Sequence, residues 1–419
     1  MLVKKVVVVG QGYVGLPLAM RAVDAGYEVV GVEVDPKRAA TLRDGGSYVE
    51  DVPAAEVAAA LATGRYRVGE DYGPARDFDY AVITVPTPLR DGLPDMSFVE
   101  DAVRSLAPLV RPGATVVLES TTYPGTTDTL VVPLLEAGSG LRAGPDFHVG
   151  YSPERIDPGN PVWGLANTPK VVSGIDAASL SSVLELYQSL VEKVVPVSGT
   201  REAELTKLLE NTFRHVNIAL VNELAVLARE LGVDVWEVVD AAATKPFGFM
   251  RFTPGPGVGG HCLPVDPSYL SWEVRRRLDR PFRFVELANE VNAQMPRYVV
   301  RRVANLLNAR RQSLNGARVL LLGLSYKKNS GDARESPALK VARLLHEQGA
   351  VLTAVDGHID PERVPAHVTL CELTPDRVAE ADVAVVLTDH DDIDWDLLED
   401  AAAVLDTRYR ARGRTVERL

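Results

Sequence analysis

The stretch "KKVVVVGQGYVGLPLA", residues 4–19, decides the fold. Its run of valines predicts a strand buried on both faces, as in a parallel sheet. Three glycines follow it in the spacing G-x-G-x-x-G, at Gly10, Gly12 and Gly15, and open a segment with helical periodicity. A second buried strand is predicted in residues 27–35. Strand, glycine turn, helix and strand together predict a βαβ unit with a right-handed crossover.

The glycine turn predicts a dinucleotide site. Gly10 allows the tight turn, Gly12 lets the backbone approach a pyrophosphate at the helix N-terminus, and Gly15 allows close packing of helix on strand. Glu33 falls at the end of the second strand, where a carboxylate can accept hydrogen bonds from ribose hydroxyls. Because that carboxylate would repel a 2′-phosphate, NAD is expected rather than NADP, with Asp35 as the alternative acid. The other interpretation is a glycine turn that serves packing alone.

Two loops are expected to line the same cofactor, since each follows a buried strand. They are "VPTPL" (85–89) and "ESTTYPGTT" (119–127). In doubly wound sheets the ligand binds at the carboxyl ends of the strands. Ordinary connecting loops are the alternative. The predicted cofactor-binding residues are Gly10, Gly12, Tyr13, Val14, Gly15, Glu33, Asp35, Pro86, Thr87 and Thr121.

The pattern along the chain predicts an α/β protein with a helical middle. Residues 202–231 have helical periodicity without an interior glycine or proline, which predicts a helix about 45 Å long. A Gly/Pro-rich loop is predicted at 246–267, and near Gly316 the strand and helix pattern restarts. The predicted domains are an NAD-binding Rossmann domain (1–200), a central helical region with the cysteine loop (201–310), and a second Rossmann-like domain (311–419).

Composition excludes several classes of function. A net charge of −12 argues against a nucleic-acid-binding surface, and no stretch approaches the roughly 20 apolar residues of a membrane span. Two cysteines cannot build a disulfide scaffold, and no signal-peptide pattern opens the chain, so a cytoplasmic setting is expected. No metal site is predicted.

One of the two cysteines lies in an unusual setting, "GPGVGGHCLPVDP" (255–267). Such a density of glycine and proline predicts a rigid backbone path that a ligand can approach closely. Cys262 there is either a nucleophile or a buried structural thiol, whereas Cys371 is expected to be structural. A thiol beside a nicotinamide cofactor can trap an aldehyde as a thiohemiacetal, whose oxidation gives a thioester that water cleaves to an acid.

The long helix offers candidate partners for that chemistry. Lys207, Asn211, Arg214 and His215 are spaced to share one helix face. A lysine and an amide on one face could hold an oxyanion. A solvated polar face is the alternative interpretation.

Seven motifs, in order between about residues 3 and 340, resemble the UDP-glucose/GDP-mannose dehydrogenase family, the NAD-dependent nucleotide-sugar 6-dehydrogenases. The resemblance implies an NAD-binding Rossmann domain, a long central helix used in dimerisation, and a C-terminal domain that binds the nucleotide-sugar. The motifs are "GQGYVGLPLA", "VPTPL", "STTYPGTT", "YSPERIDPGN", "KLLENTFR", "GPGVGGHCLPVDP" and "GLSYKKNSGDARESPA".

Residue roles come from this resemblance. Cys262 matches the catalytic thiol, and Lys207 and Asn211 match the pair that stabilises the oxyanion. Asp266 matches the carboxylate that orients a catalytic water together with the lysine. Glu154 matches the base of thioester hydrolysis.

Two further sets of roles are implied. Thr121 matches the threonine that positions the hydrolytic water. The substrate-binding residues are expected to be Arg214, Arg251, Gly259, Lys327 and Arg334.

The resemblance also bears on the substrate. Enzymes for UDP-glucose usually have a lysine where this chain has Val265, whereas "GGHC" and "SPERIDPGN" are similar to enzymes for N-acetylated hexosamines. Gly331 and Arg251 depart from the pattern of that branch. We expect oxidation of the C6 hydroxymethyl of a UDP-N-acetyl-hexosamine to a carboxylate with two NAD, and UDP-glucose and dTDP-glucose are alternatives. More remote are a two-electron dehydrogenase of the β-hydroxyacid type, which needs no thiol, and a non-catalytic nucleotide-sugar sensor.

Overall fold

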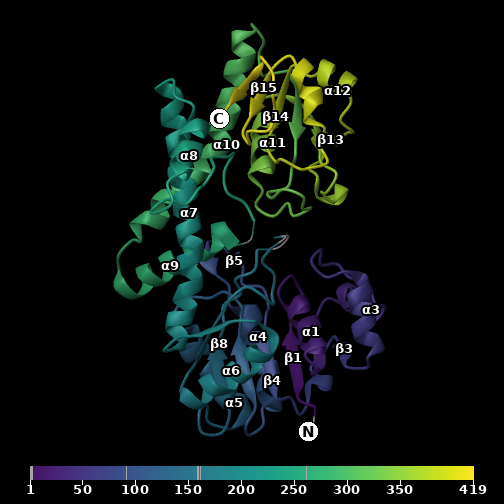
Figure 1. Ribbon diagram of the computed structural model, residues 1–419, viewed down its shortest axis with the longest axis vertical. Helices are drawn as coiled ribbons and strands as arrows, with labels where there is room; N and C mark the ends of the chain where they lie inside the picture. The colour runs from purple at the N-terminus through teal and green to yellow at the C-terminus, as the bar shows by residue number, and fades with distance from the viewer. Residues whose placement is uncertain (1–2, 91, 158–159, 161, 261) are drawn as a thin grey trace. The chain divides into compact units, whose positions relative to one another are not determined.

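The computed structural model describes residues 3–90, 92–157, 160, 162–260 and 262–419, and the side chains of Cys262 and Pro264 lie outside this description. The chain forms two compact units (Figure 1). The first comprises Met1–Glu210 and Ser268–Asp279, and the second comprises Asn211–Pro267 and Arg280–Leu419. The boundary between them falls inside helix α7 (Thr200–Glu230) and inside helix α9 (Cys262–Leu278).

The first unit contains an eight-stranded sheet in the order β10-β9-β8-β7-β4-β1-β2-β3. Six adjacent strands, β8-β7-β4-β1-β2-β3, are parallel and have the order of a dinucleotide-binding fold. Strand β9 runs antiparallel to β8 and is paired with β10 in parallel. The strands are β1 Lys5–Val9, β2 Glu28–Val32, β3 Tyr66–Gly69, β4 Tyr80–Ile83, β7 Thr115–Leu118, β8 His148–Tyr151, β9 Lys170–Gly174 and β10 Val194–Pro196, with a separate hairpin of β5 Leu89–Arg90 and β6 Leu93–Pro94.

The valine run forms the central strand of this sheet, as predicted. Val6, Val7 and Val8 are completely buried, and so are the residues of β7 that follow the same pattern. Helices cover both faces of the sheet (Figure 1), which is why its central strands carry no polar alternation. The helices of this part of the chain are α1 Gly15–Asp24, α2 Pro36–Arg43, α3 Ala54–Ala62, η1 Gly73–Ala75, α4 Ser97–Leu106, η2 Ala107–Leu109, the π-helical η3 Thr127–Val131, α5 Val132–Ser139 and α6 Ala177–Leu190.

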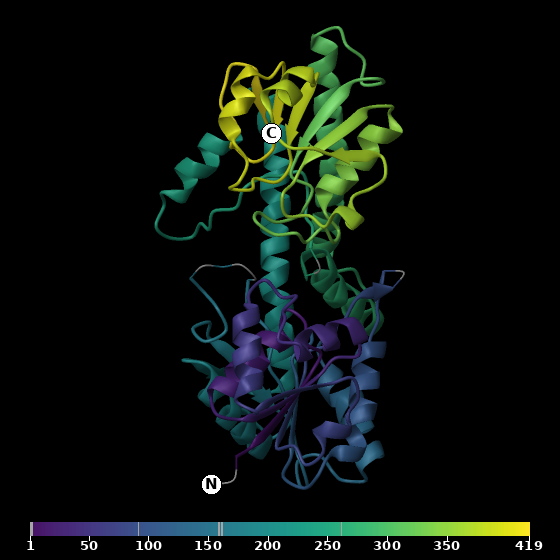
Figure 2. The same cartoon turned by 90° about the vertical axis from the view of Figure 1, so that its right-hand side faces the viewer.

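The second unit contains a six-stranded sheet in the order β13-β12-β11-β14-β15-β16, with every pair parallel. Val319 and Leu321 of β11 belong to one core cluster, and Leu320 and Leu322 belong to another, so both faces are buried. Figure 2 shows this sheet in green and yellow with helices beside it. Its elements are β11 Arg318–Leu322, α11 Pro337–Glu347, β12 Val351–Val355, η4 Pro361–Arg363, β13 Val368–Leu370, α12 Pro375–Glu380, β14 Val383–Val386, η5 Trp395–Asp400, β15 Val404–Asp406 and β16 Val416–Arg418.

The middle of the chain is helical, as predicted, and the long helix α7 spans 31 residues. It is followed by α8 (Val235–Ala243), α9 and α10 (Arg283–Ala309). The predicted loop 246–267 is too long, because α9 begins at Cys262 and contains Pro267. Pro267 is the sixth residue of α9, so it removes one backbone hydrogen bond of the helix. None of the described helices combines the length and apolarity that crossing a bilayer requires.

The glycine turn after β1 shows why its glycines are needed. Gly10 has a positive φ of 89°, and a Cβ on it would lie 2.8 Å from the Thr84 carbonyl oxygen. A Cβ on Gly15 would lie 1.9 Å from the Gly10 carbonyl oxygen. A Cβ on Gly12 would meet no atom within 4 Å. Gly10 and Gly15 therefore close the turn, while the backbone at Gly12 faces open space.

Gly15→Ala should lower the stability of the first unit, because the added methyl group overlaps the turn. We expect a loss of about 1–3 kcal/mol in the free energy of unfolding, measured by chemical denaturation followed by circular dichroism. Gly12→Ala is the matched control and should unfold like the wild type. Equal stability of both variants would contradict this account of the turn.

Candidate active site

The cofactor edge of the first unit lies where β1 and β4 end, because the strand order reverses between them. The Thr84 hydroxyl, just after β4, shares its one hydrogen between the Val9 and Gly10 carbonyl oxygens, each at 2.9 Å. This pair of bonds fixes the glycine turn against the next strand. The N-terminus of α1 follows at Gly15, and helix N-termini attract phosphate groups.

A carboxylate lies directly beside the glycine turn. Glu33, only 6% exposed, accepts a hydrogen bond from the Gln11 N–H at 3.2 Å. Tyr48 donates to the Gln11 carbonyl oxygen at 2.7 Å and completes this corner. Asp35 instead caps α2 by accepting from the N–H of Lys37. The open backbone at Gly12 and the adjacent Glu33 fit the pyrophosphate and ribose of NAD.

The two loops predicted to line the cofactor are tied together. The Ser120 hydroxyl donates to the Val85 carbonyl oxygen at 2.8 Å. The buried Tyr269 of α9 donates to the Thr87 carbonyl oxygen at 3.0 Å. Thr121 follows in this turn and is half-buried. Of the remaining predicted cofactor residues, Tyr13 and Pro86 are exposed and Val14 is half-buried.

Glu154 belongs to a buried cluster of charges. The Lys170 ammonium lies 3.0 Å from Glu154 Oε2 and 3.2 Å from Glu119 Oε1, and Tyr187 donates to Glu119. Burial raises the pKa of Glu119 despite the attraction of Lys170. Burial would also raise the pKa of Glu154, but the charge and hydrogen bond of Lys170 outweigh it and lower this pKa. The two carboxyls that share Lys170 thus have pKa values displaced in opposite directions.

Lys207 lies near this cluster in the first unit. Its side chain is 8% exposed, and its charge contributes to the low pKa of Glu154. Arg155, next to Glu154, forms an ion pair of 2.6 Å with Glu210, three residues after Lys207 on α7. The structure thus brings the predicted oxyanion lysine and the predicted base into one charged environment.

The second unit holds the other predicted members of the catalytic set. Asn211 Nδ2 donates to Asp266 Oδ2, and Asp266 is 1% exposed. His215 is also buried, with Nε2 2.8 Å from Asn289 Oδ1, and burial lowers its pKa. Arg214 is exposed. The alternative interpretation, a solvated polar face, does not hold for two residues of this helix. Asn211 is bound to Asp266, and His215 is buried.

The glycines of the cysteine loop are explained by close packing within the second unit. A Cβ on Gly259 would lie 2.7 Å from Tyr326 Cβ and 2.8 Å from Pro337 Cδ. A Cβ on Gly260 would meet the Tyr326 ring at 2.7 Å, and the Gly260 N–H donates to the Arg334 carbonyl oxygen at 3.0 Å. The loop that leads to Cys262 is therefore seated on the C-terminal motif.

The predicted substrate residues of the second unit are placed as follows. Arg334 is exposed and forms an ion pair of 2.6 Å with Asp332, whose pKa it holds down although burial would raise it. Lys327 is half-buried in the same motif. Arg251 donates twice to Asp240 Oδ1, at 2.7 and 2.9 Å.

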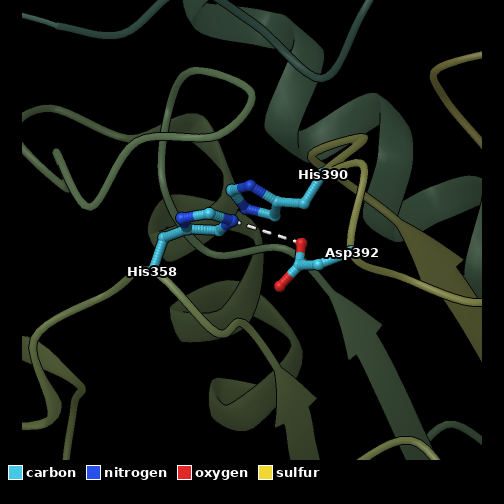
Figure 3. Close-up of side chains that lie close together, drawn as sticks. All are labelled: His358, His390 and Asp392. Atoms are coloured by element: carbon cyan, nitrogen blue, oxygen red, sulfur yellow. Dashed lines mark hydrogen bonds and ion pairs between the residues drawn. The ribbon is translucent and has the colours of Figure 1, made fainter.

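One trio of potential metal ligands occurs in the described part of the chain: His358, His390 and Asp392 (Figure 3). His358 Nε2 lies 3.2 Å from Asp392 Oδ1, and the two imidazole rings stack with centroids 4.7 Å apart. His390 Nδ1 accepts from the Asn329 N–H at 3.0 Å. Its Nε2 therefore carries the proton and donates to Asp356 Oδ2 at 3.2 Å. Since both nitrogens of His390 are engaged, this trio supports no metal site.

His390 and Asp356 instead organise the loop that carries Lys327. Asp356 Oδ2 accepts from the Leu324 and Ser325 N–H groups at 2.7 and 3.0 Å. Burial would raise the pKa of Asp356, but the hydrogen bonds from His390 and the backbone hold it well below its usual range. This buried pair fixes both ends of the loop from Leu324 to Asn329.

Sequence reasoning missed several residues that shape these sites. They act in pairs that the chain separates by tens of residues, so no local motif contains both partners. Their position in the sequence was the one available signal. Glu119 and Asp356, for example, directly follow strands, and functional sites gather at the carboxyl ends of strands. These residues are Glu119, Lys170, Glu204, Tyr269, Asp356 and His390.

The fold and the cofactor edge define an NAD-dependent dehydrogenase. The chain belongs to the UDP-glucose/GDP-mannose dehydrogenase family: its NAD binding domain matches residues 4–191, its central domain matches 201–294 and its UDP binding domain matches 320–412. It is an NAD-dependent nucleotide-sugar dehydrogenase.

Individual relatives agree with this assignment. A UDP-N-acetyl-D-mannosamine dehydrogenase of Methanococcus maripaludis is 34% identical over 93% of this chain and 87% of its own. A UDP-N-acetyl-D-glucosamine 6-dehydrogenase of Pseudomonas aeruginosa is 38% identical over 85% of this chain and 84% of its own. The solved structure of a UDP-D-ManNAc dehydrogenase from Pyrococcus horikoshii superimposes with a TM-score of 0.89 at 31% identity, covering 99% of this chain and 98% of that one.

Glu33→Ser should weaken NAD binding and relax the preference against NADP. Losing the ribose acceptor and its charge should raise the KM for NAD about tenfold or more, while the KM for NADP falls. Asp35→Ser is the matched control, because serine also caps a helix, and it should leave both KM values unchanged. The same change in both variants would mean that Glu33 is not the ribose carboxylate.

Proposed function

We propose that this enzyme oxidises the C6 hydroxymethyl group of a UDP-N-acetyl-hexosamine to a carboxylate through a thioester on Cys262. NAD accepts a hydride in each of the two oxidations. The observation that supports this most is the pairing of Asn211 with Asp266, one turn into the helix that Cys262 opens. An amide fixed by a carboxylate of the helix that Cys262 opens suits acyl chemistry better than a two-electron dehydrogenase.

In the proposed route the Cys262 thiolate adds to the C6 aldehyde carbon and forms a C–S bond. Loss of hydride from that carbon gives the thioester. Water then adds to the thioester carbon, the C–S bond breaks, and the carboxylate leaves while the sulfur keeps the electron pair. A position at the start of a helix favours the thiolate, because the helix dipole stabilises negative charge there.

Lys207 and Asn211 are proposed to stabilise the oxyanion of the tetrahedral stages. They are one helical turn apart on α7. Asp266 takes one N–H of the Asn211 amide, which fixes the orientation of the group and leaves its second N–H as a donor. A positioned donor of this type is worth about 3–4 kcal/mol in acyl transfer.

Thioester hydrolysis is assigned to Glu154, with Thr121 as a second contact of the water. The low pKa of Glu154 keeps it an acceptor for a water proton at neutral pH. Lys170 holds one of its oxygens, and the N–H of Ile156 holds the other at 2.7 Å. Glu154 is therefore better suited to orienting a water than to removing a proton from it strongly.

The sugar and the setting are also part of the proposal. Two named relatives act on UDP-N-acetylated hexosamines, which supports this substrate over UDP-glucose or dTDP-glucose. Lys327, Arg334, Arg214, Arg251 and Gly259 are the proposed substrate contacts. A cytoplasmic location is supported by the two cysteines alone.

Counting NADH per sugar tests the proposed reaction. Two NADH should form per sugar with UDP-N-acetylglucosamine or UDP-N-acetylmannosamine, and fewer turnovers should occur with UDP-glucose and dTDP-glucose. Cys262→Ala should reduce acid formation by more than about a thousandfold, as for loss of a covalent nucleophile. Cys371→Ala, the control, should retain activity because Cys371 is a half-buried thiol after β13. One NADH per sugar, unaffected by Cys262→Ala, would replace the proposal with a two-electron reaction.

We also propose a homodimer formed through α7. Leucines are exposed along this helix with spacings of three and four residues, which is the pattern of a helix-packing seam. Their exposed fractions are 60% for Leu220, 38% for Leu224 and 50% for Leu227, and Leu231, directly after the helix, is 77% exposed. A second copy of the same helix would cover this stripe, since identical faces pair in a twofold dimer.

Leu220→Asp combined with Leu227→Asp should convert the dimer to a monomer, because charges would be buried in the seam. Light scattering coupled to size exclusion should then give a mass near 45.3 kDa, half that of the parent. Leu278→Asp, at an equally exposed leucine of α9, should remain dimeric. A monomeric parent, or a dimer that survives the double change, would rule out this seam.

A further inference from the structure

A buried carboxylate that the proposed reaction does not use lies near the start of α7, at its fifth residue. Glu204 is completely buried and accepts three hydrogen bonds from the turn after β7. The donors are the Gly125 N–H, the Thr127 N–H at 2.8 Å and the Thr127 hydroxyl at 2.7 Å. These N–H groups open the helix that begins at Thr127, so Glu204 caps that helix from another element.

The capped turn is rigid and contains Thr121. The Thr122 hydroxyl donates to Thr126 Oγ1, and the Thr126 hydroxyl donates to the Tyr123 carbonyl oxygen at 2.8 Å. Gly125 has a φ of 98°, a conformation that favours glycine. Because hydrogen bonds join Thr122, Tyr123 and Thr126 within this turn, and Thr121 directly precedes them, we expect the position of Thr121 to follow that of the capped end.

Glu204 is also tied to the proposed oxyanion lysine. Lys207 follows it by three residues on α7, close to one helical turn. The same carboxylate therefore joins the turn that carries Thr121 to the helix that carries Lys207. We propose that Glu204 is a positioning residue: its ionised carboxylate holds the Thr121 turn in register with Lys207. The expected effect of Glu204 on catalysis rests on the proposed function. Its effect on the position of the Thr121 turn rests on geometry alone.

The contacts of Glu204 make its charge state matter. All three donors are neutral, and among the described residues no cation forms an ion pair with it. Burial raises the pKa of Glu204 to about 7, although the hydrogen bonds from Gly125 and Thr127 lower it. When Glu204 is protonated, its hydrogen either faces the Gly125 N–H or is donated to the Thr127 hydroxyl, which must then reverse its role, so the three bonds are no longer all accepted by the carboxylate.

Neighbouring charges are mostly neutralised by one another. Asp128, which also raises the pKa of Glu204, is paired with Arg201 at 3.0 Å and accepts from the Thr200 hydroxyl. On the facing helix α9, Arg276 and Arg277 are both paired with Glu273. Tyr123, beneath Arg276, has a pKa raised by burial. Glu204 is thus the group of this corner that changes charge near neutral pH.

Ionising Glu204 costs folding stability, which argues for a use. A raised carboxyl pKa contributes stability below the unfolded value of about 4.3, and this contribution is lost as the pH rises through about 7. Ionisation of Glu204 at neutral pH therefore lowers folding stability. A glutamine in the same position cannot ionise and would avoid this loss. A residue that served packing alone would gain nothing from this charge.

The test is Glu204→Gln against Glu202→Gln, the same change at an exposed glutamate on the same helical turn. Hydrogen exchange of the peptide covering residues 119–130, followed by mass spectrometry at pH 6, 7 and 8, reports the turn without any substrate. In the wild type its protection should rise with pH through about 7, beyond the intrinsic change in exchange rate. In Glu204→Gln the protection should be low at each pH, and Glu202→Gln should match the wild type.

Kinetics provide the second readout. Glu204→Gln should lower kcat about tenfold or more with little change in the KM for the nucleotide-sugar, and the acid limb of kcat near pH 7 should disappear. Thr127→Val removes one donor without changing the size of the side chain, and it should move that limb to higher pH.

The outcomes separate the two levels of the proposal. Unchanged protection in Glu204→Gln, or an acid limb that persists in it and does not move in Thr127→Val, would overturn the positioning role. Changed protection with a normal kcat would also overturn it, since Glu204 would then be structural only. Failure of the proposed reaction would appear as one NADH per sugar in every variant, and the exchange result would stand apart from it.

Discussion

The approach of two backbone segments at the end of β1 controls the cofactor side of this enzyme. The Gly10 carbonyl lies where a Cβ of residue 15 would be, so α1 can begin directly over the strand that precedes it. This contact places a helix N-terminus at the carboxyl edge of the sheet, and it places Glu33 beside the turn. Thr84 bonds to the same carbonyl and joins the next strand to the arrangement. The site for a dinucleotide therefore follows from the absence of one methyl group.

The second unit repeats this construction with one change. Its sheet has the same strand order, a Cβ on Gly323 would lie 2.4 Å from Thr388 Cβ, and Asp356 bonds the backbone after β11 as Glu33 does after β1. No helix begins directly after Gly323, however, because α11 starts only at Pro337. A loop held by Asp356 and His390 occupies the place of the helix N-terminus. The same strand order thus places backbone N–H groups after the central strand of the first unit and a loop with basic side chains after the central strand of the second.

Local chemistry made most of the fold predictable. Valine runs, the glycine spacing and the unbroken periodicity of residues 202–231 each describe a structure formed by neighbours in sequence. The start of α9 was not predictable in this way, because the Gly/Pro content of residues 246–267 reads as loop throughout. Its glycines are required by tertiary contact: Gly259 and Gly260 pack on Tyr326, some 66 residues away. For the same reason the candidate site could be assembled from motifs, whereas partners such as Lys170 and Glu204 could not.

The three buried glutamates near the proposed chemistry are stabilised by different means, and the differences suit different tasks. Glu154 has an ammonium and a backbone N–H, so it stays ionised and can orient a water. Glu119 shares that ammonium, but burial raises its pKa. Glu204 has only neutral donors, and burial raises its pKa to about 7. The charge of Glu204 therefore changes near neutral pH, and the hydrogen bonds it makes are those that join the Thr121 turn to α7.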